Sequence, residues 1–481
     1  MFRHCLTRWR TAFVTDVEGD LSYFTRYVEH SKVVAWSGSR LLFRDDTSNF
    51  VYGGDAFDRG DDICFARALL EFHDAHKSRV HLILGNRDIN KMVFGFPLHE
   101  ALASSRLSPD AVQRLLFPNV LITGMGVKKA LSYGEFLASL GLPPIPNETT
   151  LVQWALTHKL GAGRAFECRR GELVKLCSSP VSDENVSRSF LDAARPGGVY
   201  YDYLQRGKLA VVVDGVLFVH GSVVDENVGV VPEKCETFDS GSIHNSNIML
   251  RGGSLDDWVS ALSEFKEEGF ARWSAGRGGL FLRNYAFPYF CVPYSVVVNS
   301  IVNSNGPRYL GLGGVEFLNR SGVSVVCGGH QPSGDTPCVV QQPGLLSIAA
   351  DNSYSAGDDT RGLGVTEVLL EDDGTVCIGG LRSDGSPYSF SSSDRFVGRH
   401  IGDGWWVKSQ SSTGLYEVQR TFDAYRSKEV QVLTVEEVSA RLGSWREPPV
   451  DGEVPRKLDL KGPSSLLRAL KTKRRPSFRG N

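Results

Sequence analysis

The sequence predicts an α/β fold, and three observations lead to this interpretation. Short apolar runs at 11–15, 49–53 and 80–84 have the length and composition of buried strands. Stretches with helical spacing at 21–30 and 62–76 separate these runs, and strands that alternate with helices pair in parallel. The chain also has 51 glycines among 481 residues, a share above the roughly 7% that is usual, which favours many tight turns.

A helical insertion is predicted to follow these elements. Residues from about 97 to 208 lack the polar clusters that end the strands, and they contain helix-like stretches such as 110–117 and 186–194. Within the first ninety residues, one further strand is expected at 33–43.

The second half of the chain predicts more β-structure. Residues 209–219 predict a hairpin, because an Asp-Gly turn separates two apolar runs. A capped amphipathic helix is expected at 254–273 and a strand at 323–327. Short β-like runs between Gly, Asp and Ser turns at 345–390 suggest a second sheet that packs on the first.

The chain is expected to have three parts. One domain covers 1–395 and contains the insertion, an extension covers 396–455, and a tail covers 456–481. The tail holds nine Lys or Arg residues against the single acid Asp459, so we interpret it as a basic, disordered terminus. A targeting or partner-docking element is the alternative.

Charge and cysteine content restrict the classes of function. The 53 Lys and Arg residues balance 55 Asp and Glu residues, so no overall positive field favours nucleic acid binding. No apolar run approaches the roughly 18 residues of a membrane span. The nine cysteines are scattered, which indicates reduced thiols and a cytoplasmic location. Residues 1–10 hold three arginines and no acid, so a mitochondrial targeting segment is the alternative.

Five polar clusters carry the candidate chemistry, and each follows an apolar run. Because ligand sites in α/β sheets form beyond the carboxyl ends of the strands, we expect the clusters to meet. Their carboxylate, amide and imidazole groups suit Mn²⁺, Fe, Zn²⁺ or Mg²⁺, and an arginine among them offers a planar fork for phosphate. The clusters are residues 16–20, 54–60, 85–88, 220–221 and 329–331.

The second cluster is the most specific of the five, since it has the order Gly-Asp-x-x-Asp-Arg-Gly. With the other four in the same order along the chain, the set resembles the calcineurin-like metallophosphoesterase superfamily, and most closely its phosphoprotein-phosphatase branch. The match runs from Asp16 to about Ser355. The resemblance implies two mixed β-sheets packed face to face with helices outside.

The resemblance also implies an activity and a site. The expected enzyme is a phosphoesterase with two divalent metal ions, in which a hydroxide that bridges the ions attacks phosphorus in line. Its substrate would be a phosphorylated small molecule, nucleotide or protein. The expected metal ligands are Asp16 and Glu18 for the first ion, Asp55 for both ions, and Asn86, His220 and His330 for the second. The expected catalytic residues are Arg59, Arg87 and Asp58. Arg59 would hold the phosphate, Asp58 would pair with Arg87, and Arg87 can stabilise charge on the phosphoryl group or the leaving oxygen.

Two residues depart from the family pattern. Glu18 stands where the family has a histidine, and a hard carboxylate ligand favours Mn²⁺ or Mg²⁺. Arg87 stands where the family has the histidine that protonates the leaving oxygen, and a guanidinium is a poor proton donor. Loss of general acid catalysis costs on the order of 10²–10⁴ in rate. We therefore expect either a preference for acidic leaving groups, such as phosphoanhydrides and aryl phosphates, or the use of another acid.

Two other functions stay open on the sequence alone. The same departures fit a metal-binding scaffold that has lost turnover, and the basic tail fits a module that recruits partners. Asp351 lies in a segment that either lines the rim of the site or forms turns. Cys327 and Cys338 flank His330 and are expected to be buried structural thiols.

Overall fold

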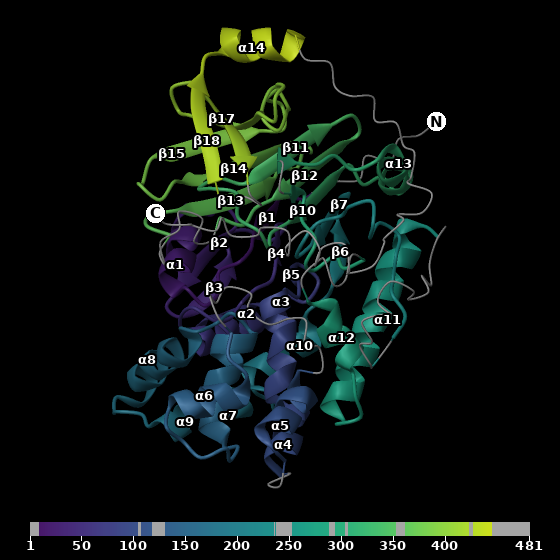
Figure 1. Cartoon of the computed structure of the whole chain (residues 1–481). Coiled ribbons are helices and arrows are strands. Elements are labelled where there is room, and N and C mark those ends of the chain that lie inside the picture. Colours follow the sequence, from purple (N-terminus) through teal and green to yellow (C-terminus); the bar gives the residue numbers. More distant parts are fainter. Residues whose placement is uncertain are drawn as a thin grey trace, which may run out of the picture. The chain divides into compact units, whose positions relative to one another are not determined.

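The structure is a computed structural model, and it describes residues 9–103, 107–117, 130–234, 236, 253–287, 294–303, 306–352, 361–422 and 427–444. Residues up to Arg446 form one compact unit (Figure 1). The basic tail at 456–481 and residues 1–8 lie outside the described part of the chain. Among the helices described, none is both long and apolar enough to cross a membrane.

The first sheet has six strands in the order β15-β14-β13-β1-β4-β5. Strands β1, β4 and β5 are parallel to one another, and β13, β14 and β15 continue the sheet in antiparallel fashion from the other edge of β1. The strands are β1 (Thr11–Val14), β4 (Asn49–Tyr52), β5 (Val80–Leu82), β13 (Val365–Leu370), β14 (Val376–Leu381) and β15 (Pro387–Ser391).

The second sheet has five strands in the order β11-β12-β10-β7-β6. Strand β10 lies parallel to β7 and β12, while β6 and β11 are antiparallel edges. The strands are β6 (Ala210–Val213), β7 (Val216–Val219), β10 (Val325–Gly328), β11 (Cys338–Gln342) and β12 (Leu345–Ala349).

The two sheets pack face to face. Phe13 of β1 and Phe218 of β7 are fully buried, and their ring centroids lie 5.4 Å apart. Ala12 and Val14 belong to the hydrophobic cluster on the other face, which includes Phe24 of α1 (Leu21–His30). This alternation follows from the two-residue period of a strand. The expected sandwich of two mixed sheets with outer helices is therefore confirmed.

Helices cover the outer faces of both sheets. Besides α1, they are α2 (Asp62–Ala75), α11 (Leu255–Ser274), α12 (Leu280–Tyr285) and α13 (Leu312–Arg320). The described part of 97–208 is helical, as predicted, and Figure 1 shows α4–α9 gathered on one side of the unit. The helices in this part of the chain are α4 (Phe96–Ala103), α5 (Pro109–Leu116), α6 (Tyr133–Ser139), α7 (Glu148–Trp154), α8 (Ala165–Cys177), α9 (Asp183–Ala193) and α10 (Val199–Arg206).

Two strand predictions were wrong in detail. Residues 33–43 form a hairpin of β2 (Val34–Ser37) and β3 (Arg40–Phe43) instead of one strand, because Gly38 turns the chain with a φ of 61°. Residues 365–391 join the first sheet instead of the second, since β13 pairs with the open edge of β1. Alternation along a strand shows that it is half-buried but not which edge it joins.

Part of the predicted extension forms a third, three-stranded sheet. Strands β16 (Trp406–Gln410), β17 (Tyr416–Phe422) and β18 (Ser427–Leu433) are antiparallel and precede α14 (Val435–Ser444). Val407 of β16 belongs to the same hydrophobic cluster as Phe13 and Phe218, so residues 396–444 extend the main core.

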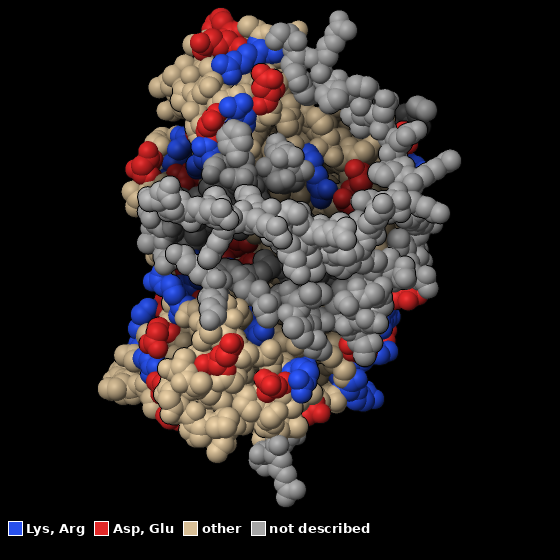
Figure 2. Space-filling view, viewed as in Figure 1, with Lys and Arg blue, Asp and Glu red and all other residues tan. Residues whose placement is uncertain are grey.

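The charged side chains at the surface and the cysteines are arranged as the amino-acid composition suggests. On the face shown in Figure 2, positive and negative side chains of the described residues are interspersed. Cys327 and Cys338 are buried and free, and burial raises the pKa of both thiols. The prediction that these two thiols are buried is confirmed.

Candidate metal centre

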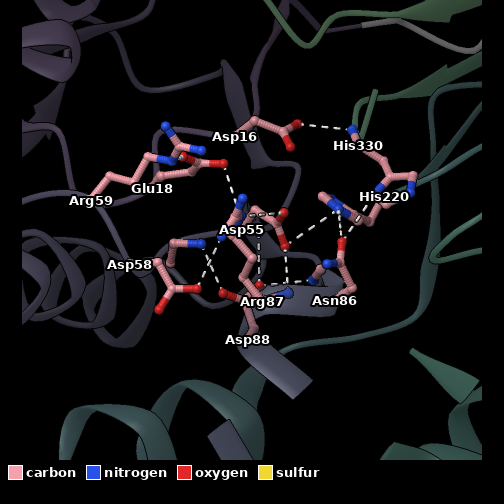
Figure 3. A network of polar contacts seen from close by, with 12 residues as sticks. Asp16, Glu18, Asp55, Asp58, Arg59, Asn86, Arg87, Asp88, His220 and His330 are labelled. Atoms are coloured by element: carbon pink, nitrogen blue, oxygen red, sulfur yellow. Dashed lines mark hydrogen bonds and ion pairs between the residues drawn. The ribbon is translucent and has the colours of Figure 1, made fainter. Parts of the chain in front are cut away.

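The five polar clusters meet at the carboxyl ends of β1, β4, β5, β7 and β10 (Figure 3). Five residues of this site have a positive φ although they are not glycine: Asp16 (φ 54°), Glu18 (φ 54°), Asp55 (φ 55°), Asp58 (φ 110°) and His330 (φ 71°). Such conformations cost free energy of order 1–3 kcal/mol each and concentrate at functional sites. The strand ends are thus shaped to aim these side chains at one point.

Asp55, His220 and His330 form a candidate cation site. One ligand atom from each of the three lies within 4.8 Å of the others, and no other such group occurs among the described His, Cys, Asp and Glu residues. The Nδ1 atom of His220 lies 2.8 Å from the carbonyl oxygen of Gly53. If Nδ1–H donates to this carbonyl, the Nε2 lone pair faces the Oδ1 atom of Asp55 at 3.4 Å.

Asn86 completes the set of donors. It begins α3 (Asn86–Asn90), and its Oδ1 atom lies 2.9 Å from Nδ1 of His330 and 3.3 Å from Nε2 of His220. Two imidazoles, one carboxylate and one amide oxygen match the nitrogen and oxygen ligands that divalent transition metals take in proteins. The residues therefore fit a divalent cation.

The electrostatics of this site are strongly coupled. Burial opposes ionisation of Asp55, but His220, Arg87 and His330 hold its pKa below the usual range. Burial also opposes a charged His220, yet Asp55 and Asp16 raise its pKa to about 10. Burial and the neighbouring His220 lower the pKa of His330 to about 3. The pKa of the Asp55 carboxyl is thus lowered, while the pKa values of the two neighbouring imidazoles shift in opposite directions, up for His220 and down for His330.

Asp16 lies next to this group. Its Oδ2 atom accepts hydrogen bonds from the Thr15 hydroxyl at 2.7 Å and from the backbone N–H of His330 at 3.0 Å. Burial raises the pKa of Asp16, and the negative charges of Asp351 and Asp55 raise it further. Asp351 is itself buried, and its effect on the pKa of Asp16 shows that it lies near the site.

Glu18 lies between two arginines. Its Oε2 atom is 2.7 Å from Nε of Arg59, and its Oε1 atom is 2.8 Å from Nε of Arg87. Arg87 also pairs with Asp58, whose Oδ2 atom is 3.2 Å from Nη1, as the resemblance implied. The carboxylates of Glu18, Asp55 and Asp58 hold the pKa of Arg87 above its usual range, although burial opposes this.

Lys91 was not singled out from the sequence. It is fully buried, and its Nζ atom lies 2.5 Å from Oδ1 of Asp58. Because Lys91 follows Arg87 by four residues, both side chains emerge on the same side of one helical turn, and this spacing was the available signal. The carboxylates of Glu18, Asp55 and Asp58 are thus in contact with three cationic side chains, those of Arg59, Arg87 and Lys91.

Asp88 belongs to the predicted cluster 85–88, but the sequence did not indicate its role. Its Oδ2 atom accepts the backbone N–H groups of Asp55 at 2.9 Å and Gly85 at 2.7 Å, and its Oδ1 atom accepts that of Ala56 at 2.7 Å. One fully buried carboxylate thereby fastens the loop after β4 to the start of α3. An acidic residue in the first turn of a helix was the signal.

The helical insertion reaches this site through buried charges. Asp58 has a φ of 110°, and its backbone N–H donates to Oδ1 of Asp62 at 3.0 Å. The other oxygen of Asp62 lies 3.3 Å from Nη2 of Arg169, on α8. The same Nη2 donates to the Tyr200 hydroxyl at 2.8 Å. Residues far apart in sequence therefore set the backbone of Asp58.

Comparisons with known proteins give matches in structure but not in sequence. No protein-family model matches this chain, and no curated protein matches it significantly.

Two solved structures illustrate the structural matches. A cold-active protein-tyrosine phosphatase of a psychrophilic Shewanella species is 14% identical, with a TM-score of 0.41 over 79% of this chain and 80% of that one. A protein serine/threonine phosphatase from Saccharomyces cerevisiae, with similarity to human phosphatase PP5, is 11% identical, with a TM-score of 0.31 over 93% of this chain and 83% of that one. On its own geometry, this chain has the two mixed sheets and the converging strand-end clusters that its resemblance to the calcineurin-like metallophosphoesterase superfamily implies.

Proposed function

We propose that this protein is a metal-dependent phosphoesterase that hydrolyses a phosphate ester or a phosphoanhydride. The position of Asp55 carries the proposal. Its carboxylate lies 3.4 Å from the Nε2 atom of His220 on one side and 3.6 Å from the Nε atom of Arg87 on the other. The candidate cation site is thus adjacent to guanidinium groups, which bind phosphoryl oxygens well.

The bound cation would supply Lewis-acid polarisation of a phosphoryl oxygen and activation of water. Mn²⁺ is our first choice, because the site offers hard oxygen ligands together with imidazole. His220 is oriented by Gly53, and Asp55 by Asp88, so the donor atoms are held in place before any ligand arrives.

The arginines would bind and stabilise the phosphoryl group. The Arg59 side chain is 27% exposed and that of Arg87 is 18% exposed, whereas Lys91 is fully buried. Arg59 is therefore the cation best placed to meet a substrate from solvent. Fixed cations next to a phosphoryl group stabilise the charge that develops in the transition state.

Proton delivery to the leaving oxygen sets the expected substrate range. Arg87 cannot act as a general acid at neutral pH, and Lys91 is buried in its ion pair with Asp58. A leaving group that departs as a stable anion needs no proton. We therefore propose aryl phosphates and phosphoanhydrides as the preferred substrates.

The direct test is hydrolysis of para-nitrophenyl phosphate by the full chain with added Mn²⁺, compared with the Asp55→Asn variant. Activity that depends on Mn²⁺ and disappears in the variant would support the proposal. A series of aryl and alkyl phosphates tests the substrate range, because Arg87→His should help alkyl phosphates most. Equal effects of that variant on both classes would contradict the leaving-group argument.

A metal-binding scaffold without turnover is the second candidate. The observation that favours it is Glu18, whose two oxygens lie within 2.8 Å of Arg59 and Arg87 and neutralise the groups that would bind phosphate. The scaffold predicts that Mn²⁺ raises the melting temperature of the protein while no phosphate ester in a broad panel is hydrolysed.

A further inference from the structure

The structure differs from the family resemblance at the position of the first metal ion. The resemblance assigns Asp16, Glu18 and Asp55 to that ion. Glu18, however, has a guanidinium nitrogen within 2.8 Å of each of its oxygens. Oδ2 of Asp16 already accepts two hydrogen bonds. Among the described residues, the group of three possible metal ligands within 4.8 Å of one another is Asp55, His220 and His330. It includes neither Asp16 nor Glu18.

Arg87 bridges the two carboxylates that would otherwise share the first ion. Its Nε atom lies 2.8 Å from Oε1 of Glu18 and 3.6 Å from Oδ2 of Asp55. Its backbone N–H donates to Oδ1 of Asp55 at 2.8 Å. A positive charge therefore already lies between Glu18 and Asp55, and a guanidinium cannot lose that charge by deprotonation.

The guanidinium is held firmly in this position. Asp58 binds its Nη1 atom at 3.2 Å, and Asp58 is itself paired with the fully buried Lys91 at 2.5 Å. A divalent ion between Glu18 and Asp55 would lie close to this fixed like charge, and like charges a few ångströms apart repel strongly in a site shielded from water.

From these contacts we propose that the centre binds a single divalent cation, at Asp55, His220 and His330, and that the Arg87 side chain takes the place of the first ion. This inference refines the proposed metal-dependent function and rests on it for the presence of a cation. It makes Glu18 a positioning residue that anchors Arg59 and Arg87 instead of a metal ligand.

The metal content of the full chain tests this inference without reference to activity. The purified protein is saturated with Mn²⁺, separated from free ions and analysed by mass spectrometry of the metal and by electron paramagnetic resonance. We expect one Mn²⁺ per chain with the spectrum of an isolated ion. Two tightly bound ions per chain, a spin-coupled spectrum or no bound ion would overturn the inference.

Two variants test whether Arg87 is the reason that only one cation binds. The double variant Glu18→His, Arg87→His restores a neutral ligand and removes the guanidinium, so it should bind two ions and show spin coupling. Arg59→Ala is the matched control, because it removes the other guanidinium that contacts Glu18 and leaves Arg87 in place. This control should still bind one ion. A double variant that folds, as judged by circular dichroism, and still binds one ion would contradict the role of Arg87.

The two proposals can fail separately. One bound ion without hydrolysis of any phosphate ester would remove the proposed activity and leave the single-ion centre intact. Two bound ions with full activity would remove the single-ion centre and leave the phosphoesterase.

Discussion

Asp88 accepts the backbone N–H of Asp55 on its Oδ2 atom at 2.9 Å. The same carboxylate accepts the N–H groups of Ala56 and Gly85, so it joins two strand-end clusters that lie thirty residues apart in the sequence. The position of Asp55, which is central to the candidate cation site, therefore depends on a residue that needs no contact with a ligand.

Replacing Asp88 with Asn should destabilise the fold. The amide keeps one acceptor oxygen and turns N–H donors toward a buried backbone N–H, so at least one hydrogen bond is lost. A buried donor that loses its acceptor costs about 1–3 kcal/mol, and we expect the free energy of unfolding to fall by about that amount. Urea denaturation measures it.

Asp61→Asn is the control for this variant. Asp61 pairs with Lys175, whose side chain is 69% exposed, and such surface pairs contribute about 0–1 kcal/mol. Equal losses in the two variants would show that Asp88 is not the anchor described above.

Arg169 should be needed for both stability and activity. It is fully buried and lies 3.3 Å from Asp62 and 3.4 Å from Glu172. Removing one partner of a buried ion pair costs about 3–5 kcal/mol, so Arg169→Leu should lower the free energy of unfolding by that amount. Because Asp62 holds the backbone of Asp58, kcat should fall as well, measured at a temperature where the variant is folded.

The neighbouring Arg170 provides a matched control. Its side chain is 25% exposed and pairs with Glu167 and Asp183 at the surface. Arg170→Leu should change the free energy of unfolding by less than about 1 kcal/mol and leave kcat unchanged. A kcat that is the same in both variants would contradict the coupling of the insertion to Asp58.

His81 should make the stability of the fold depend on pH in the acidic range. Burial, and then the charge of Lys208, lower the pKa of His81 from 6.5 to about 4. Between these values the unfolded chain binds the proton and the folded chain does not, so stability falls as pH drops from 6.5 to 4. The loss is about 1–3 kcal/mol.

His81→Gln should remove this part of the pH dependence. Urea denaturation at pH 7 and at pH 4.5 measures the difference for each protein. His30→Gln serves as the control, since His30 is exposed, and it should keep the wild-type slope. A slope that His81→Gln leaves unchanged would show that other groups cause it.

The convergence of the site was predictable because it follows from local patterns. Each cluster comes directly after an apolar strand, and parallel strands bring their carboxyl ends to the same edge. The residues that the sequence did not indicate act through tertiary contacts. Lys91 has the pattern of a surface residue on a helical turn, and only the fold shows that it is buried against Asp58.

The surroundings of Glu18 were unpredictable for the same reason. Its identity as an acid favoured a metal ligand, but two arginines from other strand ends surround it in the structure. The sheet membership of β13 depended in a similar way on the free edge of β1. Sequence patterns thus identify which groups approach the site, whereas their pairing depends on the whole fold.

Arg283 is a buried cation in the helical part of the fold. Its side chain lies on α12, which packs against α3, and none of its three guanidinium nitrogens has a hydrogen-bond partner among the described residues. Burial lowers its pKa to about 10. A buried charge without an opposite charge is costly.

Arg283→Met should therefore stabilise the protein. We expect the free energy of unfolding, measured by urea denaturation, to rise by about 1–4 kcal/mol. Arg277→Met is the control, because Arg277 is exposed and its loss should leave the free energy of unfolding unchanged. A less stable Arg283→Met variant would show that Arg283 has a structural partner within the chain.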